Sequence, residues 1–306
     1  MHVSNPPFTI TSKIIFLVGQ ISECVGNIFI TPKLCKENFI KTITGTLEIE
    51  GNTLGEEKIT AILEGKKVLG SVREIAEVHG AIKVYEDLSQ WNYSKEKDLL
   101  KAHGILMGEI LTHAGKYRLS QVGISGKDGV THIAPPSERV PLLMSDLFGW
   151  LKSTKEHPLI VSSVFHYEFE FIHPFSDGNG RMGRLWQTLI LYQWKPLFAM
   201  IPIESVVREK QQAYYKALED SGVEGESTLF VEFMLESILE ACQNIFESNQ
   251  KILELMANNP KITIAGLMQE LNLSESGIKK IIAKLKTENK LKRTGSLKGG
   301  EWEVVG

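Results

Sequence analysis

The chain has 306 residues, which exceeds one average domain and predicts one large domain with a smaller one. Its hydrophobic fraction of 42% and charged fraction of 23% are ordinary for a globular protein with a sizeable core. The formal net charge of -3 gives no whole-chain reason to expect nucleic acid or an acidic membrane as a partner. Any such role would need a local patch.

The cysteines and the most apolar run bear on the cellular compartment. Cys24, Cys35 and Cys242 are an odd, scattered set without metal-ligand spacing, so we expect buried thiols in a reducing compartment. The run 14–18 is too short to span a bilayer, and no basic segment and cleavage site surround it. We therefore expect a cytoplasmic protein without a membrane partner.

Apolar residues recur at intervals of three and four along most of the chain, which predicts helices. The predicted helices cover 12–30, 36–50, 55–69, 72–90, 96–114, 140–152, 158–172, 180–194, 205–221 and 228–247. Gly51 and Gly65 stand where a glycine would end the second and third of these helices. Thr53 and Glu56 have the spacing of a capping box that opens the third.

One segment has a different pattern. Residues 122–124 and 130–133 flank Ser125-Gly126-Lys127-Asp128-Gly129, in which Asp-Gly marks a hairpin turn. Pro135-Pro136 then separates this hairpin from the next helix. A lone hairpin is marginal by itself, so it either packs on helices or receives a third strand. The expected fold of the large domain is all-α with one β-hairpin.

The tail from about residue 251 has a pattern of its own. Residues 262–271 and 275–289 predict two short helices around a turn at Asn272-Leu273-Ser274. Residues 301–305 then alternate as a strand after a glycine pair. Helix, turn, helix and strand outline a small winged helix-turn-helix domain.

The loop after the helix 158–172 can form an anion site. His173 follows that helix, Pro174 stops it, and a glycine-rich turn leads into the next helix near Gly180. Backbone N–H groups of such a turn and of the first helical turn point toward one spot and form an anion cradle. The P-loop pattern with its lysine does not occur here. The sequence therefore predicts a phosphate cradle of another kind.

The side chains around this loop suit a metal-bound polyphosphate. Arg181 and Arg184 are three residues apart and share a helix face near the positive helix end. Asp177 is the hard oxygen ligand that Mg²⁺ requires, and His173 is a candidate general base for an attacking hydroxyl. His166 lies seven residues before His173, but no third ligand at a suitable spacing supports a zinc site.

The segment His173-Pro-Phe-Ser-Asp-Gly-Asn-Gly-Arg-Met-Gly-Arg184 resembles the Fic signature His-Pro-Phe-x-Asp/Glu-Gly-Asn-Gly-Arg-x-x-Arg at every specified position. The resemblance implies a protein adenylyltransferase in which His173 deprotonates a Ser, Thr or Tyr hydroxyl of a target protein, which receives AMP from ATP. It implies that Asp177 holds Mg²⁺ on the α- and β-phosphates. The phosphate-binding residues that it implies are Gly178, Asn179 and Gly180 at the α-phosphate, with Arg181 and Arg184 at the β- and γ-phosphates.

A second motif resembles the inhibitory pattern of the family, Ser/Thr-x-x-x-Glu-Gly/Asn. Thr46, Glu50 and Gly51 match it, within an expected inhibitory helix at 36–51. The resemblance implies that Glu50 pairs with Arg184 and takes the place meant for the γ-phosphate, which would repel the incoming anion. The alternative is an ordinary helix with a solvated glutamate and a glycine cap.

The hairpin resembles the flap of the family, which pairs with the target backbone by strand addition. Val122, Gly123 and Ile124 are therefore candidate target-binding residues, although the hairpin tip also suits a surface loop.

The pair Tyr214-Tyr215 resembles the tyrosines that line the adenine pocket of the family, with one ring stacked on the base. Adjacent tyrosines in a helix are more often one core and one surface residue. Ser221-Gly222 stands where some relatives have an asparagine, so adenine recognition departs from the family pattern here.

The expected domains are an N-terminal helical region (1–95), a Fic core (96–247) and a winged helix-turn-helix domain (251–306). Expected ligands and partners are ATP, Mg²⁺ and a target protein, while self-modification, a homodimer and DNA binding stay open. Basic residues favour phosphate contacts in the tail: Lys279, Lys280, Lys284, Lys286, Lys290, Lys292 and Arg293. Glutamates dilute them: Glu270, Glu275, Glu288, Glu301 and Glu303.

Four hypotheses for function remain. The first is protein AMPylation restrained by Glu50, and the second is removal of AMP at the same site, with Glu50 positioning a water. The third is a DNA-binding regulator whose Fic portion senses nucleotide. The fourth is a kinase or phosphocholine branch, which ranks last because those branches alter the loop or the donor pocket while Gly178 and Gly180 are intact here.

Overall fold

The computed structural model of the chain describes residues 5–28, 32–126, 129–271, 275–287, 290–295 and 300–305. Its helices are α1 (Ser12–Asn27), α2 (Pro32–Ile49), α3 (Gly55–Leu63), α4 (Val72–Glu86), α5 (Glu96–Met107), α6 (Val140–Ser153), α7 (Pro158–Ile172), α8 (Asn179–Trp194), α9 (Ile203–Glu209), α10 (Gln211–Glu224), α11 (Thr228–Asn258), α12 (Ile264–Leu271) and α13 (Glu275–Thr287). Its strands are β1 (Gly123–Gly126), β2 (Gly129–Ile133), β3 (Leu291–Thr294) and β4 (Glu301–Val304). The expected helical fold with a hairpin and a small C-terminal winged module is confirmed.

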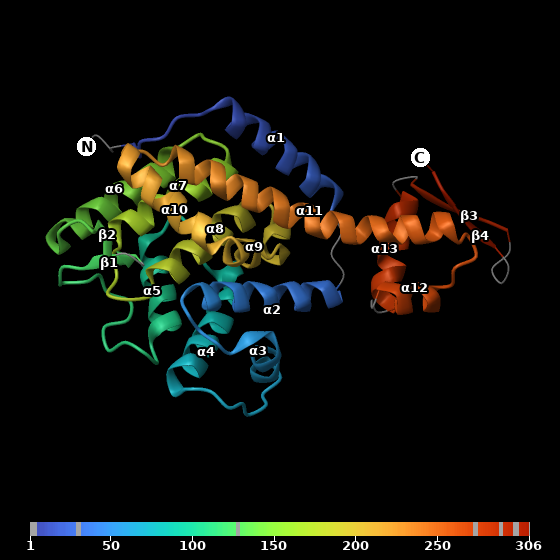
Figure 1. Cartoon of the computed structure of the whole chain (residues 1–306), viewed down its shortest axis with the longest axis horizontal. Helices are drawn as coiled ribbons and strands as arrows, with labels where there is room; N and C mark the ends of the chain where they lie inside the picture. The colour runs from blue at the N-terminus through green and yellow to red at the C-terminus, as the bar shows by residue number, and fades with distance from the viewer. Residues whose placement is uncertain are drawn as a thin grey trace.

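The large helical body is built around α7 and α8, which pack against each other (Figure 1). The long helix α11 lies against α7 and also contacts α1, α9 and α10. Phe165 and Phe169 on α7 and Trp186 on α8 are fully buried. Burial of one such side chain stabilises the fold by about 1.5–3 kcal/mol, so this helical pair is the rigid base of the loop that joins it.

Helix α2 carries the predicted inhibitory segment and packs against α9 (Figure 1). Gly45 makes this packing close, because a Cβ at that position would lie 2.7 Å from the backbone of Glu204. Gly51 follows the helix with φ of 86°, a left-handed conformation that ends a helix readily at glycine. The predicted glycine stops at Gly51 and Gly65 (φ 73°) are both confirmed.

The capping box predicted at Thr53 and Glu56 is wrong. Helix α3 begins at Gly55, and Leu54 precedes it without a side-chain capping bond. The Thr53 hydroxyl instead donates to Glu74 Oε1 at 2.7 Å. Glu74 belongs to a capping box with Ser71 at the start of α4, so this carboxylate draws Thr53 away from its own helix.

Several predicted helices have different ends in the structure. The predicted helix 205–221 is divided into α9 and α10 at Lys210, whose φ of -102° and ψ of 26° are not helical. Helices α3 and α5 end before their predicted limits, while α11 continues to Asn258. The extra turns of α11 carry Ile252 and Met256, which are fully buried in the C-terminal core.

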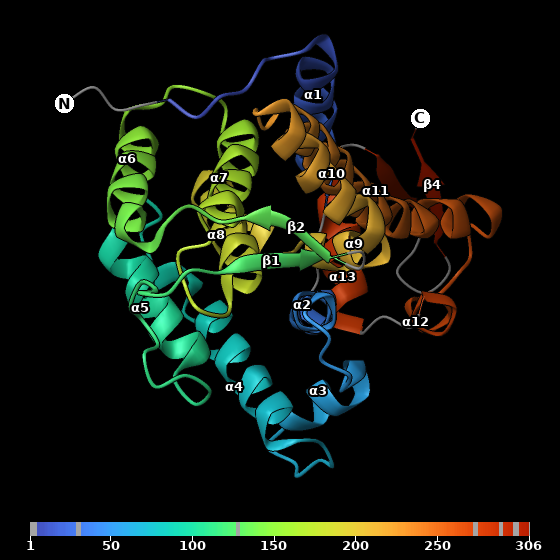
Figure 2. The same ribbon diagram turned by 60° about the vertical axis from the view of Figure 1, so that its left-hand side comes forward.

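The hairpin is confirmed, and its strands pair antiparallel with Gly123 opposite Ile133. A bulge lies between Ile124 and Ser125. The turn residues Lys127 and Asp128 lie outside the described residues. Figure 2 shows the two strands passing in front of the ends of α7 and α8.

The C-terminal module has its own hydrophobic core, which includes Leu267, Ile278, Leu285 and Trp302. It lies at the far end of α11 from the flap (Figure 1). Strand β3 pairs antiparallel with β4, and the sequence pattern did not predict it. The predicted turn at 272–274 lies outside the described residues. Among the helices described, none combines the length and apolar character needed to cross a membrane.

Candidate nucleotide site

The loop between α7 and α8 is held by two left-handed residues. His173 caps α7 with φ of 50° and ψ of 60°, and its N–H donates to Phe169 O at 2.9 Å. In the described part of the chain, His173 is the one non-glycine residue with positive φ. Gly178 has φ of 84° and precedes α8, and a Cβ there would lie 2.9 Å from Met107 Sδ. The left-handed conformation costs a non-glycine residue about 1–2 kcal/mol, so neighbouring contacts must hold His173 in place.

Phe175 and Asn179 close this loop on itself. Phe175 is fully buried and anchors the loop in the core. Asn179 Oδ1 accepts from the Phe175 N–H at 2.8 Å, and its Nδ2 donates to Phe175 O at 2.9 Å. The Asn179 side chain is therefore used inside the loop. The groups that remain able to bind an anion are therefore the backbone N–H groups of the first turn of α8, because they have no partner inside the helix.

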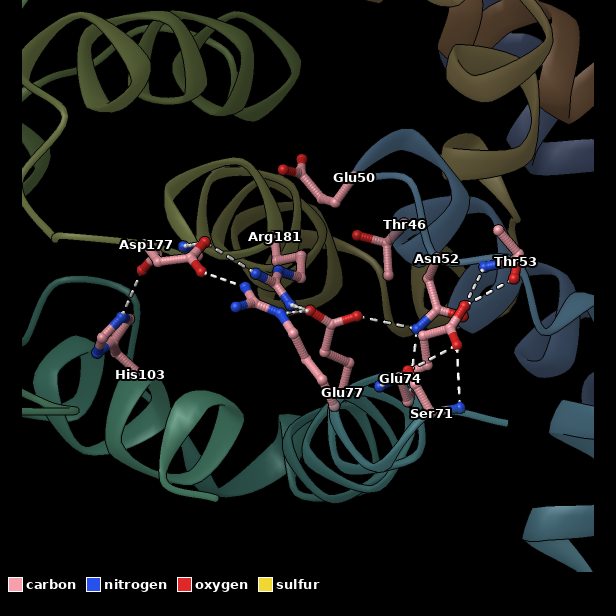
Figure 3. A network of polar contacts seen from close by, with 12 residues as sticks. Thr46, Glu50, Asn52, Thr53, Ser71, Glu74, Glu77, His103, Asp177 and Arg181 are labelled. Carbon is pink, nitrogen blue, oxygen red and sulfur yellow. Dashed lines mark hydrogen bonds and ion pairs between the residues drawn. The ribbon is translucent and has the colours of Figure 1, made fainter. Parts of the chain in front are cut away.

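His103 on α5 supports the loop from below. Its ring stacks on Phe175 with centroids 3.6 Å apart. The Gly115 N–H donates to His103 Nδ1 at 2.8 Å, so the ring proton lies on Nε2 and donates to Asp177 O at 3.0 Å (Figure 3). Burial lowers the pKa of His103 to about 4, so the ring is neutral near pH 7. It fixes the loop backbone through one specific tautomer.

Asp177 is paired with two guanidiniums in this structure. Arg73 on α4 donates to Asp177 Oδ2 at 2.6 Å, and Arg181 donates to Oδ1 at 3.1 Å (Figure 3). No group of three or more His, Cys, Asp or Glu among the described residues could hold a metal ion. Mg²⁺ on a nucleotide needs only one or two carboxylates, because phosphate oxygens and waters complete its coordination. The half-exposed carboxylate of Asp177 fits that role, with Arg73 as its competitor.

Arg181 is occupied by acidic groups. Besides Asp177, its guanidinium lies 3.1 Å from Glu77 Oε1 on α4. Asn52, two residues after Glu50, donates to Glu77 Oε2 at 2.9 Å. Figure 3 shows this row of side chains running from the turn after α2 to the loop before α8. The turn after the predicted inhibitory segment is thus joined, through a hydrogen bond to Glu77 and ion pairs beyond it, to Arg181 on α8 and to Asp177 in the loop.

Arg184 and Glu50 form the ion pair that the resemblance implies. Arg184 Nη2 donates to Glu50 Oε1 at 2.7 Å and to Thr46 O at 3.0 Å, while Nε donates to Thr46 Oγ1 at 2.9 Å. Arg184 is only 2% exposed, so little water competes for this charge. The same Glu50 oxygen lies 2.3 Å from where a Cβ on Gly180 would be. The carboxylate therefore rests against the first turn of α8.

Glu170 on α7 lies between the side chains of His166 and His173. Its Oε2 is 3.9 Å from His173 Nδ1, and its Oε1 is 4.0 Å from His166 Nε2. Burial, with the nearby charge of Glu50, raises the pKa of Glu170 to about 8. A neutral carboxyl therefore faces the candidate general base at neutral pH.

The tyrosine pair is divided between core and surface. Tyr214 is 2% exposed, and its hydroxyl lies 3.1 Å from His166 Nε2. Tyr215 is 48% exposed and donates to Ile49 O at 3.2 Å, and Gln211 donates to the same carbonyl at 2.8 Å. Tyr215 and Gln211 of α10 thus hold the end of α2. His166 is buried, with hydrogen-bond partners in Gln187 and Tyr214.

The structure brings together the predicted site residues at the loop and on α2, while Tyr214 lies beneath them in the core. Sequence reasoning missed Arg73, Glu77, His103, Arg118 and Glu170, which come from three helices and a loop. Only Glu170 had a local signal, because it lies one helical turn before His173.

Fold and site together define a largely helical protein with a glycine-rich loop between its two central helices and a glutamate, just after α2, that is paired with an arginine of the second of these helices. The model of the Fic/DOC family matches residues 93–191, and that of a winged helix-turn-helix DNA-binding family matches residues 246–292. A Fic family protein from Desulfovibrio desulfuricans is similar over 99% of both chains, with 42% identity and a TM-score of 0.78. The chain belongs to the Fic family.

Two other relatives are more distant. The protein adenylyltransferase Fic of Culex quinquefasciatus is 31% identical over 210 residues, which are 65% of this chain and 40% of that protein. The chain therefore spans well under half of this curated relative. Fic-1 of C. elegans is 24% identical with a TM-score of 0.64 over 78% of this chain and 72% of that one, which supports the fold alone.

Proposed function

We propose that this chain transfers AMP from ATP to a hydroxyl group of a target protein and that Glu50 restrains the reaction. The observation that carries the proposal is the Glu50 carboxylate bound to Arg184 against the first turn of α8. A helix N-terminus with a buried arginine binds anions, and a carboxylate there stands in for a phosphate oxygen. The name of the Culex relative supports the choice of AMP transfer among the phosphate chemistries.

In the proposed reaction His173 takes the proton of the target hydroxyl. The oxygen then bonds to the α-phosphorus of ATP, the bond from that phosphorus to the bridging oxygen breaks, and pyrophosphate leaves. Gly178, Gly180 and the Asn179 backbone would donate to the α-phosphate, where charge develops. Asp177 would hold Mg²⁺, which neutralises charge on the departing phosphates. Arg181 and Arg184 would bind the β- and γ-phosphates after release from Glu77 and Glu50.

The flap is the proposed docking site for the target. Strands β1 and β2 form a two-stranded sheet within the described residues, so a third strand can pair along an outer edge. An extended target segment on Val122, Gly123 and Ile124 would bring its hydroxyl toward His173. Self-modification requires the same approach by another copy of the chain.

Replacement of Glu50 tests the restraint. We expect Glu50→Gly to raise automodification with α-³²P-labelled ATP by at least about 10-fold, since it frees Arg184 for a phosphate. Glu48→Gln is the matched control, because Glu48 lies two residues before Glu50 and pairs instead with the exposed Arg208 of α9, at 2.6 Å. Adding His173→Ala to Glu50→Gly should abolish the gain. Equal labelling of wild type and Glu50→Gly would contradict the restraint.

The alternative activity, removal of AMP, is tested with the same two proteins, wild type and Glu50→Gly. An AMPylated protein incubated without ATP should keep its label in the presence of the Glu50→Gly form. Faster release of AMP by wild type than by Glu50→Gly would assign Glu50 to water activation and would overturn transfer as the main activity.

A further inference from the structure

A buried arginine, Arg118, lies between the flap and the loop that carries His173. Arg118 is 3% exposed, and its guanidinium donates to backbone carbonyls alone. Among the described residues no carboxylate lies within ion-pair distance of it. A buried guanidinium without a carboxylate is costly, so its carbonyl partners must supply the compensation.

The carbonyl partners come from three separate segments of the chain. Nε donates to His173 O at 2.7 Å, and Nη2 reaches Ile172 O at 3.3 Å, both at the end of α7. Nη2 also donates to Pro135 O at 2.5 Å, and Nη1 donates to Ser120 O at 2.9 Å. Ser120 precedes β1 and Pro135 follows β2. One side chain therefore binds both roots of the flap and the backbone of the candidate base.

The backbone of the same residue adds a further tie. The Arg118 N–H donates to Pro174 O at 2.9 Å, on the other side of His173. The carbonyls of Ile172 and His173 are at the negative end of α7, where a cation is favoured. Desolvation lowers the pKa of Arg118, and the group still stays charged near pH 7 because arginine titrates far above that range.

We propose that Arg118 is a positioning residue that holds His173 in its left-handed conformation and joins that conformation to the placement of the flap. A shift of the flap when a target docks is then transmitted to the backbone of His173 through the Arg118 guanidinium. Only arginine has five donors in a rigid fork, and lysine could serve some of these carbonyls but not all four. The expected effect on the automodification rate rests on the proposed function, whereas the joint positioning of the flap and His173 does not.

The kinetic test uses Glu50→Gly as the parent protein. Adding Arg118→Gln should lower the automodification rate at saturating ATP by about 10- to 100-fold, the scale of a small misplacement of a catalytic group. The Kd for MgATP, measured by calorimetry, should change less than about 2-fold, because Arg118 is bonded to the flap roots and to the loop before the phosphate cradle. Arg118→Lys should recover part of the rate. Arg139→Lys, at an exposed arginine after the flap, is the matched control and should have no effect.

A folded Arg118→Gln form with the parent rate would overturn the proposal, and so would parallel losses of rate and MgATP affinity. An inactive parent would contradict the proposed function instead. The second readout is independent of activity and uses wild-type protein: amide hydrogen exchange by mass spectrometry. Arg118→Gln should raise exchange at 119–122 and at 173–175 together, with α8 unchanged. A rise on the flap side alone would show that the two segments are not joined through Arg118.

Discussion

At the residue scale, the site contains a buried carboxyl group, Glu170, with a raised pKa. Glu170 faces Glu50, which follows α2, and Arg184 on α8. His166 on the same helix and His173, which caps that helix, are also near. Burial is the larger cause that raises its pKa from 4.5 to about 8, and Glu50 is the second. A close approach to α8 is possible because the neighbour there is a glycine, Gly183, where a Cβ would lie 3.0 Å from Glu170 Oε1.

This raised pKa makes stability depend on pH. Between about pH 4.5 and 8 the unfolded chain has lost the Glu170 proton while the folded chain keeps it, so the folded state binds more protons. The free energy of unfolding therefore falls as pH rises through this window. We expect Glu170→Gln to flatten the fall by about 2–4 kcal/mol between pH 5 and 8, as one pKa unit corresponds to about 1.4 kcal/mol.

Urea unfolding at a series of pH values measures this effect. The difference between wild type and Glu170→Gln isolates Glu170 from Glu168, whose pKa burial also raises, to about 7. Glu156→Gln, at an exposed position, should give a curve parallel to wild type. Parallel curves for wild type and Glu170→Gln would show that Glu170 is ionised in the folded state across the window.

At the element scale, helix periodicity predicted most of the helices, because α7, α8 and α11 bury apolar faces of ordinary length. The site motif was readable because His173, Asp177, Arg181 and Arg184 lie within one loop and one helix turn. The supporting residues were not, since Arg73, His103 and Arg118 meet that loop only through tertiary packing.

The misjudged helix ends have the same physical cause. Thr53 donates a hydrogen bond to a carboxylate on another helix, so it does not cap its own. Helix α11 continues because its extra turns bury apolar side chains in the C-terminal core. Propensity is a weak prior that such contacts override. The pairing of Glu50 with Arg184 came from a family pattern, and no local periodicity would have indicated a partner 134 residues away.

The packing of α2 on α9 gives a prediction at this scale. Gly45→Ala places a Cβ 2.7 Å from the Glu204 carbonyl carbon and 2.8 Å from Ser205 N, which are backbone atoms that cannot give way. We expect a loss of about 1–3 kcal/mol of stability, the usual cost of overpacking. As α2 shifts, Glu50 should leave Arg184, and automodification should rise toward the Glu50→Gly level. Thermal unfolding and α-³²P labelling measure the two effects.

Gly19→Ala is the matched control for this experiment, because its Cβ would meet no atom within 4 Å on α1. It should be neutral or slightly stabilising, by about 0.5–1 kcal/mol, as expected for alanine within a helix. If Gly45→Ala is destabilised but remains as inactive as wild type, the position of α2 does not control the site.

At the scale of the whole molecule, α11 connects two hydrophobic cores. The larger core surrounds α7 and α8, and the smaller one is centred on residues of α12, α13 and Trp302. The Trp302 indole donates to Ile262 O at 3.1 Å, and Lys286 and Arg293 lie over its ring. Two of the basic residues considered for phosphate contact thus also pack on Trp302 within the module.

Replacement of Trp302 should separate the two cores. Trp302→Ala removes a central side chain of the small core at a cost of about 3–5 kcal/mol, which a small module does not withstand. We expect faster amide exchange in α12 and α13, with α7 and α8 unchanged, and full automodification in the Glu50→Gly background. A matching rise in exchange in α7 and α8 would show that the cores unfold as one unit.

The central claim is that Glu50 occupies the position of a phosphate on Arg184. The most direct test is a crystal structure of the Glu50→Gly form with ATP and Mg²⁺. The account predicts a triphosphate in the loop between His173 and Arg184, with its terminal phosphate bonded to the Arg184 guanidinium and the α-phosphate near the first turn of α8. An empty loop beside an accessible Arg184, or ATP bound elsewhere, would contradict it.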